Sequence, residues 1–149
     1  MFKRILVPVD GSETANSALV TALQMARDTG GRVRVLHAMD ELAYLSVYEY
    51  SGDMVKIWRD EAAKIIDKAM SMAQSAGVAA DQALIEAPGT RLGDVVAKGA
   101  VEWEADLIVV GTHGRRGLGR VLLGSGAEQI IRVAPVPVLV VRGEKPAHA

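Results

Sequence analysis

The feature that most constrains the fold is an alternation of short apolar runs with longer stretches of helical period. Residues 4–9 (RILVPV) are apolar and β-branched, and Leu19 and Leu23 then follow at helical spacing. The alternation continues through five predicted strands to the last run, at residues 136–141. This order is typical of a parallel sheet with right-handed crossovers. We predict an α/β fold, a single doubly wound domain over residues 1–149 with helices on both faces of the sheet.

Composition narrows the functional classes. Half of the 149 residues are apolar, enough for one core without covalent staples, and the absence of cysteine excludes disulfides and thiolate chemistry. Lys and Arg number 17 against 18 Asp and Glu, so no bulk attraction to nucleic acid or to anionic lipid is expected. The first apolar run stops at Asp10, too early for a signal peptide or a membrane span. We expect a cytoplasmic protein without a nucleic-acid or membrane partner.

The middle of the chain is less regular. Residues 39–55 have no clean period and are predicted to be a loop, with a short helical piece within it as the alternative, whereas an apolar stripe from Trp58 to Gly77 predicts a helix. A short strand is expected over residues 83–87, and Thr90 can cap the helix that follows. The residues 143–149 are expected to form a loose tail. The loop contains the three tyrosines, whose role the sequence does not decide: Tyr44, Tyr48 and Tyr50.

The strongest functional signal follows the run ADLIVV at residues 105–110. That run is typical of a parallel strand covered on both faces, at the centre of the sheet. The next segment, 111–126 (GTHGRRGLGRVLLGSG), holds six glycines and leads into a helix near Ser125. Ligands of open α/β sheets bind beyond the carboxyl ends of the strands, where backbone N–H groups and a helix N-terminus can meet an anion. The alternative is a flexible surface loop that binds nothing.

Two polar residues beside this segment have two interpretations each. Asp10 either approaches a ligand or serves as the N-cap of the first helix, with Glu13 three residues on. Ser125 either donates to a phosphate or caps its helix, with Glu128 three residues on. One side chain can serve both roles, so the alternatives stay open.

No catalytic residue and no protein metal site are predicted. His113 lies in the glycine-rich segment, but no second histidine or carboxylate stands at metal-like spacing from it, and His37 is interpreted as a strand residue. Arg115 is the favoured phosphate contact over Arg116, although a solvated pair is the alternative. The phosphate-binding lysine of the Walker pattern is absent, since no lysine stands between residues 98 and 145. Fast ATP hydrolysis is therefore not expected.

The spacing Gly111-x2-Gly114-x9-Gly124-Ser125, with the opening KRILVPVDGSE and the closing APVPVLVVR, resembles the ATP-binding subgroup of the universal stress protein (UspA-like) family. The resemblance implies a five-stranded sheet in the order 3-2-1-4-5, with ATP over the ends of strands 1, 2 and 4. Whether Mg²⁺ accompanies the nucleotide stays open. At Gly126 similar proteins often carry Val or Thr, which bears on affinity. The resemblance places the following residues at the nucleotide: Pro8, Val9, Asp10, Ala38, Val110, Gly111, Gly114, Arg115, Gly124, Ser125, Gly126 and Ala127.

The sequence of the last strand predicts that the protein associates with another chain. Pro137 cannot donate to a ladder on both sides, so this uncharged strand belongs at a sheet edge, where it invites pairing with another chain. A twofold homodimer is expected, and the alternative is an edge covered by the tail. We predict an ATP-binding regulatory dimer of the stress response; the alternatives are a slow ATP hydrolase and a nucleotide-free dimeric scaffold. The interface residues are Val136, Val138, Leu139, Val140 and Val141.

Overall fold

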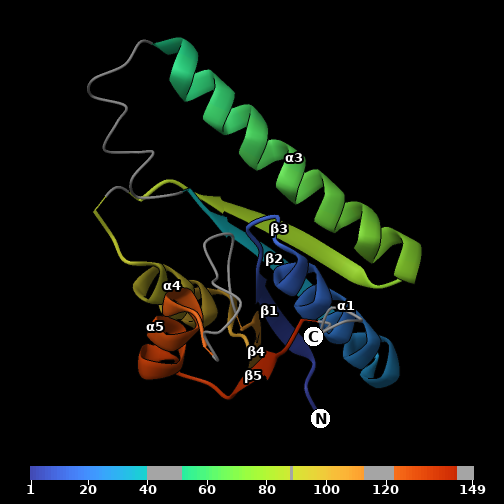
Figure 1. The fold of residues 1–149 in the computed structure, drawn as a ribbon. Coiled ribbons are helices and arrows are strands. Elements are labelled where there is room, and N and C mark those ends of the chain that lie inside the picture. Colours follow the sequence, from blue (N-terminus) through green and yellow to red (C-terminus); the bar gives the residue numbers. More distant parts are fainter. Residues whose placement is uncertain (40–51, 88, 113–122, 144–149) are drawn as a thin grey trace, which may run out of the picture.

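The computed structural model describes residues 1–39, 52–87, 89–112 and 123–143. These residues form a five-stranded parallel sheet in the order β3-β2-β1-β4-β5, which confirms the predicted fold class and strand order (Figure 1). The strands are β1 (Arg4–Pro8), β2 (Arg32–Ala38), β3 (Ala79–Ile85), β4 (Leu107–Gly111) and β5 (Val138–Val141). The helices are α1 (Glu13–Thr29), α3 (Gly52–Ala76), α4 (Leu92–Trp103) and α5 (Ser125–Val133).

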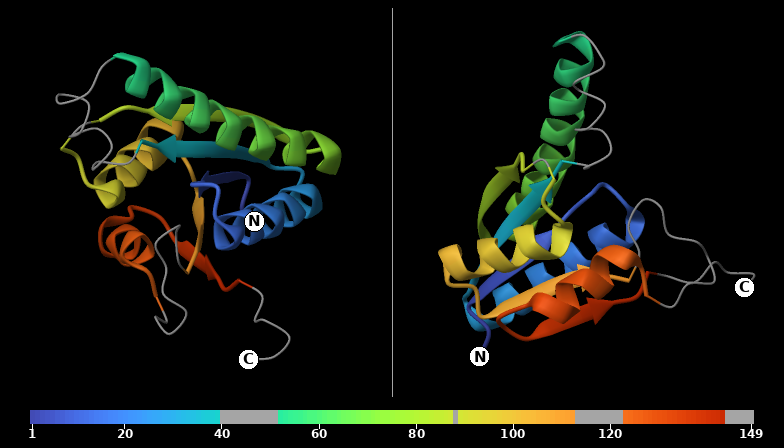
Figure 2. Two further views of the ribbon diagram at one scale, coloured as in Figure 1. Left: turned by 45° about the horizontal axis from the view of Figure 1, so that its top comes forward. Right: turned by 90° about the vertical axis from the view of Figure 1, so that its left-hand side faces the viewer.

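The sheet separates two hydrophobic cores. Because side chains alternate along a strand, Ile5 and Val7 of β1 pack under α1 and α3, whereas Leu6 packs under α4 and α5. Figures 1 and 2 show the two pairs of helices on opposite faces. In β4 all five residues are buried, as the continuous apolar run predicts for a central strand.

Several element bounds differ from the prediction. Helix α3 begins at Gly52, within the predicted loop; the predicted apolar stripe started only at Trp58, although Met54 stands four residues before it at helical spacing. Strand β3 begins earlier, at Ala79, since its pairing with β2 and not its own sequence extends it. Thr90 is not a cap: Arg91 is the N-cap of α4, without a side-chain cap bond, and the Thr90 N–H donates to the Ala87 carbonyl at 3.1 Å.

Strand β5 lies at the sheet edge, as Pro137 indicates, but it begins only at Val138. Pro137 precedes it and accepts a hydrogen bond from the Ile108 N–H at 3.0 Å. The ring nitrogen of Pro137 has no hydrogen to give to a ladder, so the strand starts after it.

Charged residues gather at the amino ends of the strands. Arg4 donates from Nε and Nη2 to the Trp103 carbonyl at 3.0 and 2.6 Å, and its guanidinium carbon lies 4.4 Å from the centre of the Trp103 ring. Arg34 lies over the same ring and forms a bidentate ion pair with Asp81 at 2.7 and 2.8 Å. The hydrogen bond from Arg34 holds the pKa of Asp81 below its ordinary value. These partners satisfy one another, so we assign them to stability.

Candidate functional site

The carboxyl ends of β1, β2 and β4 meet where the strand order reverses. From β1 the chain continues to β2 on one side, while β4 lies on the other side of β1. The residue after β1 is Val9, whose N–H donates to the Leu36 carbonyl of β2 at 2.8 Å. The Val9 carbonyl accepts a hydrogen bond from His37 Nδ1 at 2.7 Å. The edge where a ligand would bind is therefore built from backbone groups of β1 and β2.

Asp10 shapes the turn that follows β1. Its Oδ1 accepts a hydrogen bond from the Ser12 N–H at 2.9 Å, and Gly11 between them adopts a φ of +84°. Ser12, not Asp10, is the N-cap of α1: its Oγ accepts from the Ala15 N–H at 3.2 Å. The N-cap interpretation of Asp10 is therefore wrong, because the hydroxyl two residues later has the position from which the first-turn N–H is reached.

Gly111 ends β4 against the first turn of α1. A Cβ atom at Gly111 would lie 2.7 Å from the carbonyl carbon and oxygen of Thr14 and 3.0 Å from the Ala15 nitrogen. Close packing of strand and helix is thus sufficient to require this glycine, without any phosphate. The next residue, Thr112, is buried; its N–H donates to the Val141 carbonyl at 3.0 Å, and its carbonyl accepts from the Gly124 N–H. The first bond joins the end of β4 to β5, and the second attaches the start of α5 to the end of β4.

Helix α5 begins without a side-chain cap. Gly124 is the N-cap, with φ −72° and ψ 161°, and Ser125 is the first helical residue. The predicted capping box is therefore wrong: the helix already begins at Ser125, one residue too early for Ser125 to be its cap, and Glu128 instead pairs with Arg132 at 2.8 Å. Within the described residues, no side chain caps the first N–H groups of α5. Such N–H groups, together with the positive end of the helix dipole, favour an anion.

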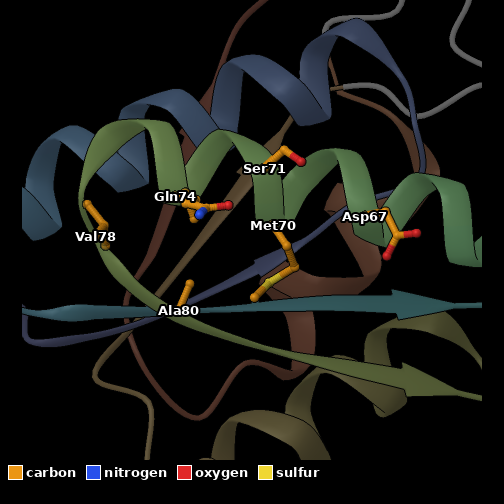
Figure 3. A pocket seen from close by; sticks show the side chains of 7 residues that line it. Asp67, Met70, Ser71, Gln74, Val78 and Ala80 are labelled. Carbon is orange, nitrogen blue, oxygen red and sulfur yellow. The ribbon is translucent and has the colours of Figure 1, made fainter.

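Two hollows lie between neighbouring elements of the described chain. One, of about 330 Å³, separates α4 from α5, and the exposed Ser125 side chain lines it beside Arg91 and Gln129. The other, of about 490 Å³, lies between α3 and β3, and Figure 3 shows Met70 extending from the helix toward the sheet there. This larger hollow is lined by Asp67 and by no basic residue, so it does not suit a phosphate. The backbone edge above remains the better candidate site.

Comparison with known proteins identifies the family. The sequence profile of the universal stress protein family matches residues 1–142. This chain belongs to the universal stress protein family. A universal stress protein of Methanocaldococcus jannaschii is 33% identical over 147 residues, which cover 97% of this chain and 85% of that protein.

Solved structures share the fold over nearly the whole chain. A hypothetical protein whose biochemical function was assigned from its structure superposes with a TM-score of 0.82 at 29% identity, over 98% of this chain and 99% of its own. The universal stress protein of Archaeoglobus fulgidus in complex with dAMP gives a TM-score of 0.71 at 25% identity, over 94% of this chain and 98% of its own. A family relative of this fold thus binds an adenine nucleotide.

Within this family fold, most of the predicted nucleotide residues lie at the same edge. Pro8 ends β1, Ala38 ends β2, and residues 124–127 begin α5. Five of the predicted residues are buried: Pro8, Val9, Val110, Gly111 and Ala127. The predicted residues Gly114 and Arg115 lie outside the described part of the chain, as do His113, Arg116 and the three tyrosines.

His37 is the residue that sequence reasoning undervalued. Its side chain is only 8% exposed, and its ring reaches across to β1. No local pattern marks a histidine near the end of a strand as special; its partner lies 28 positions earlier and is adjacent only after β1 and β2 pair. In the described parts of the chain there is no cluster of His, Asp or Glu suited to a metal, and no helix there has the length and apolarity to span a bilayer.

Proposed function

We propose that this universal stress protein domain binds an adenine nucleotide, ATP in particular, across the carboxyl ends of β1, β2 and β4. The observation that carries the proposal is the open backbone at Ala38. Met39 donates its N–H to the Ile85 carbonyl of β3 at 3.1 Å, so Ala38, one residue earlier, presents its backbone groups to the β1 side. Among the described residues the Ala38 N–H makes no hydrogen bond to the Val9 carbonyl, which would be its ladder partner.

This backbone pair suits adenine. In an extended strand the N–H and C=O of one residue point to the same neighbouring strand. The Watson–Crick edge of adenine offers N1 as an acceptor next to the N6 amino group as a donor, which complements one backbone N–H beside one C=O. Guanine presents the reverse order and would leave the protein groups unpaired. Ala38 thus supports selection of adenine over guanine.

The phosphates belong at α5 in this proposal. Backbone N–H groups of residues 124–127 would donate to them, with Gly114 and Arg115 adding contacts from the segment before the helix, and Asp10 would approach the ribose. The dAMP complex of the Archaeoglobus fulgidus relative supports the same class of ligand. Mg²⁺ would accompany a triphosphate on its oxygens without a dedicated protein ligand set.

The bound nucleotide would act as a regulatory signal in the stress response, in a cytoplasmic protein, and not as a fuel. We infer at most slow hydrolysis, because the phosphate groups would be held by backbone N–H groups and not by a phosphate-binding lysine. An ATP turnover assay over several hours, with and without Mg²⁺, tests this part. Turnover faster than about 1 s⁻¹, the lower end of ordinary enzyme rates, would contradict it.

Nucleotide titration tests the binding proposal. Protein stripped by unfolding and refolding is titrated calorimetrically with ATP, ADP, AMP and GTP. We expect adenine nucleotides to bind at least about tenfold more tightly than GTP. Gly124→Val should weaken ATP binding, because the valine side chain would stand between a phosphate and the first N–H groups of α5. The fold should tolerate the valine, because the backbone angles at this position, φ −72° and ψ 161°, suit any residue.

A matched control exists at the neighbouring helix. Arg91 is the N-cap of α4 with nearly the same backbone angles, φ −70° and ψ 148°, and also lacks a side-chain cap bond. Arg91→Val therefore places the same valine at an equivalent helix start and should leave ATP affinity unchanged. Failure of the wild-type protein to bind any adenine nucleotide would reject the proposal. If Gly124→Val and Arg91→Val weaken ATP binding equally, the phosphates are not bound at the start of α5.

We further propose that two copies associate through β5 as a twofold homodimer. Strand β5 is a sheet edge, and Leu139 on it is 37% exposed while Val138, Val140 and Val141 are half-buried. Leu139→Lys should lower the mass measured by light scattering from that of a dimer to that of a monomer. Val101→Lys, at a 63% exposed position on α4, is the control and should leave the mass unchanged. A wild-type monomer would contradict the dimer.

A further inference from the structure

The buried His37 ring is hydrogen-bonded to a backbone group of the neighbouring strand's end. His37 lies on the face of β2 that Val33 and Val35 share, under α1 and α3, and is 8% exposed. Its Nδ1 is 2.7 Å from the Val9 carbonyl oxygen. Because a carbonyl oxygen only accepts, Nδ1 must carry the hydrogen in this bond. The bond therefore assigns the Nδ1–H tautomer to the neutral ring.

This bond stands where the β1–β2 ladder would otherwise continue. The register pairs Pro8 with Leu36, and Val9 donates its N–H to the Leu36 carbonyl. In a parallel ladder the next bond would run from the Ala38 N–H to the Val9 carbonyl. That bond is missing from the part of the chain that the structure describes, and the Val9 carbonyl accepts from the imidazole.

We propose that His37 is a positioning residue that holds the ladder open at Val9 and so keeps the Ala38 N–H available for adenine N1. The inference rests on the proposed nucleotide function. Without the imidazole, the Val9 carbonyl would be a buried acceptor lacking a partner, and the Ala38 N–H is the nearest donor in the ladder order. Closing that one bond would remove the donor that reads adenine.

Two substitutions separate this role from general packing. His37→Asn places an amide nitrogen at the same distance from the backbone as Nδ1, so it can still donate to the Val9 carbonyl. His37→Gln has the same amide group but carries it one bond farther out, near the position of Nε2. We expect His37→Gln to weaken adenine-nucleotide binding about tenfold, the equivalent of one hydrogen bond, and His37→Asn to remain within about threefold of wild type.

Two measurements need no nucleotide and therefore separate this inference from the proposed function. Nitrogen NMR of the wild-type ring should show a protonated Nδ1 and an unprotonated Nε2. Hydrogen exchange of the Ala38 amide should be fast in the wild-type protein and in His37→Asn, and slower in His37→Gln, in which the ladder closes. Thermal melts establish that each variant is folded.

The outcomes are distinct. An Nε2–H tautomer in the wild-type ring, or an Ala38 amide already protected from exchange there, would overturn the inference whether or not any variant folds. Equal ATP affinity of wild type and His37→Gln would also overturn it. If wild type binds no adenine nucleotide but the tautomer and exchange results are as expected, the proposed function fails and the open ladder stands.

Discussion

The contact between Gly111 and α1 leads to the sharpest prediction about stability. Gly111→Ala adds one methyl group, and that group would lie 2.7 Å from the Thr14 carbonyl carbon and oxygen. Both are backbone atoms of a helix, so no rotamer change relieves the overlap. Either the first turn of α1 or the end of β4 must move, and each is held by hydrogen bonds: the Asn16 N–H donates to the Ser12 carbonyl at 3.0 Å in the helix, and the Thr112 N–H after β4 donates to the Val141 carbonyl at 3.0 Å.

The cost follows from the overlap. Overpacking by a methyl group usually destabilises by about 1–3 kcal/mol, and backbone neighbours that cannot repack place Gly111→Ala near the upper end, at about 3 kcal/mol. For a chain of this size each kcal/mol lowers Tm by about 2–4 °C, so we expect a fall of about 6–12 °C. The expected fall applies to nucleotide-free protein.

Urea unfolding of nucleotide-free protein measures the effect, and Gly126→Ala is the control within the same glycine-rich segment. A Cβ atom at Gly126 would meet the end of a flexible side chain, Leu92 Cδ2, at 3.0 Å, and alanine is a better helix former by up to about 1 kcal/mol. We expect Gly126→Ala to be neutral or slightly stabilising. If Gly111→Ala is as stable as the wild-type protein and loses only nucleotide affinity, the packing argument is refuted. Gly111 would then be required for phosphate binding and not for packing.

Three further changes test other parts of the structure. Asp81→Asn removes the carboxylate whose pKa Arg34 lowers, and this ion pair stabilises the fold at pH values above the ordinary carboxyl pKa. The substitution should lower the free energy of unfolding by at most about 1 kcal/mol at pH 7, and this loss should shrink as the pH falls below about 4. A loss that does not depend on pH would contradict the assignment. Ser12→Ala removes the N-cap bond to the Ala15 N–H and should cost about 1 kcal/mol in urea unfolding, whereas an unchanged midpoint would discount that cap. Trp103→Ala empties a buried site and should cost about 3–5 kcal/mol by the same assay; a cost below about 1 kcal/mol would mean that the ring is not part of the core.

The sequence patterns predicted the type of each secondary-structure element accurately and the positions of the element ends less accurately. The prediction of helices and strands was correct because burial on one face imposes a period that is visible in any window of the chain. The predicted helix caps were one or two residues away from the observed ones. Asp10 was predicted where Ser12 is the N-cap, Thr90 where Arg91 is the N-cap, and Ser125 where Gly124 is the N-cap. Neighbouring polar residues can each cap a helix, and tertiary packing decides which has the required backbone angles.

The sequence alone determined the α/β class, the edge position of the last strand and the glycine-rich segment after the central strand, since each follows from residues close together in the chain. The tertiary structure decided what individual residues do there. Gly111 is a glycine because Thr14, 97 positions earlier, presses on it, and His37 bonds to Val9 because β1 and β2 pair. Contacts between strands and helices that are distant in the chain leave no periodic trace, so only the folded arrangement reveals them.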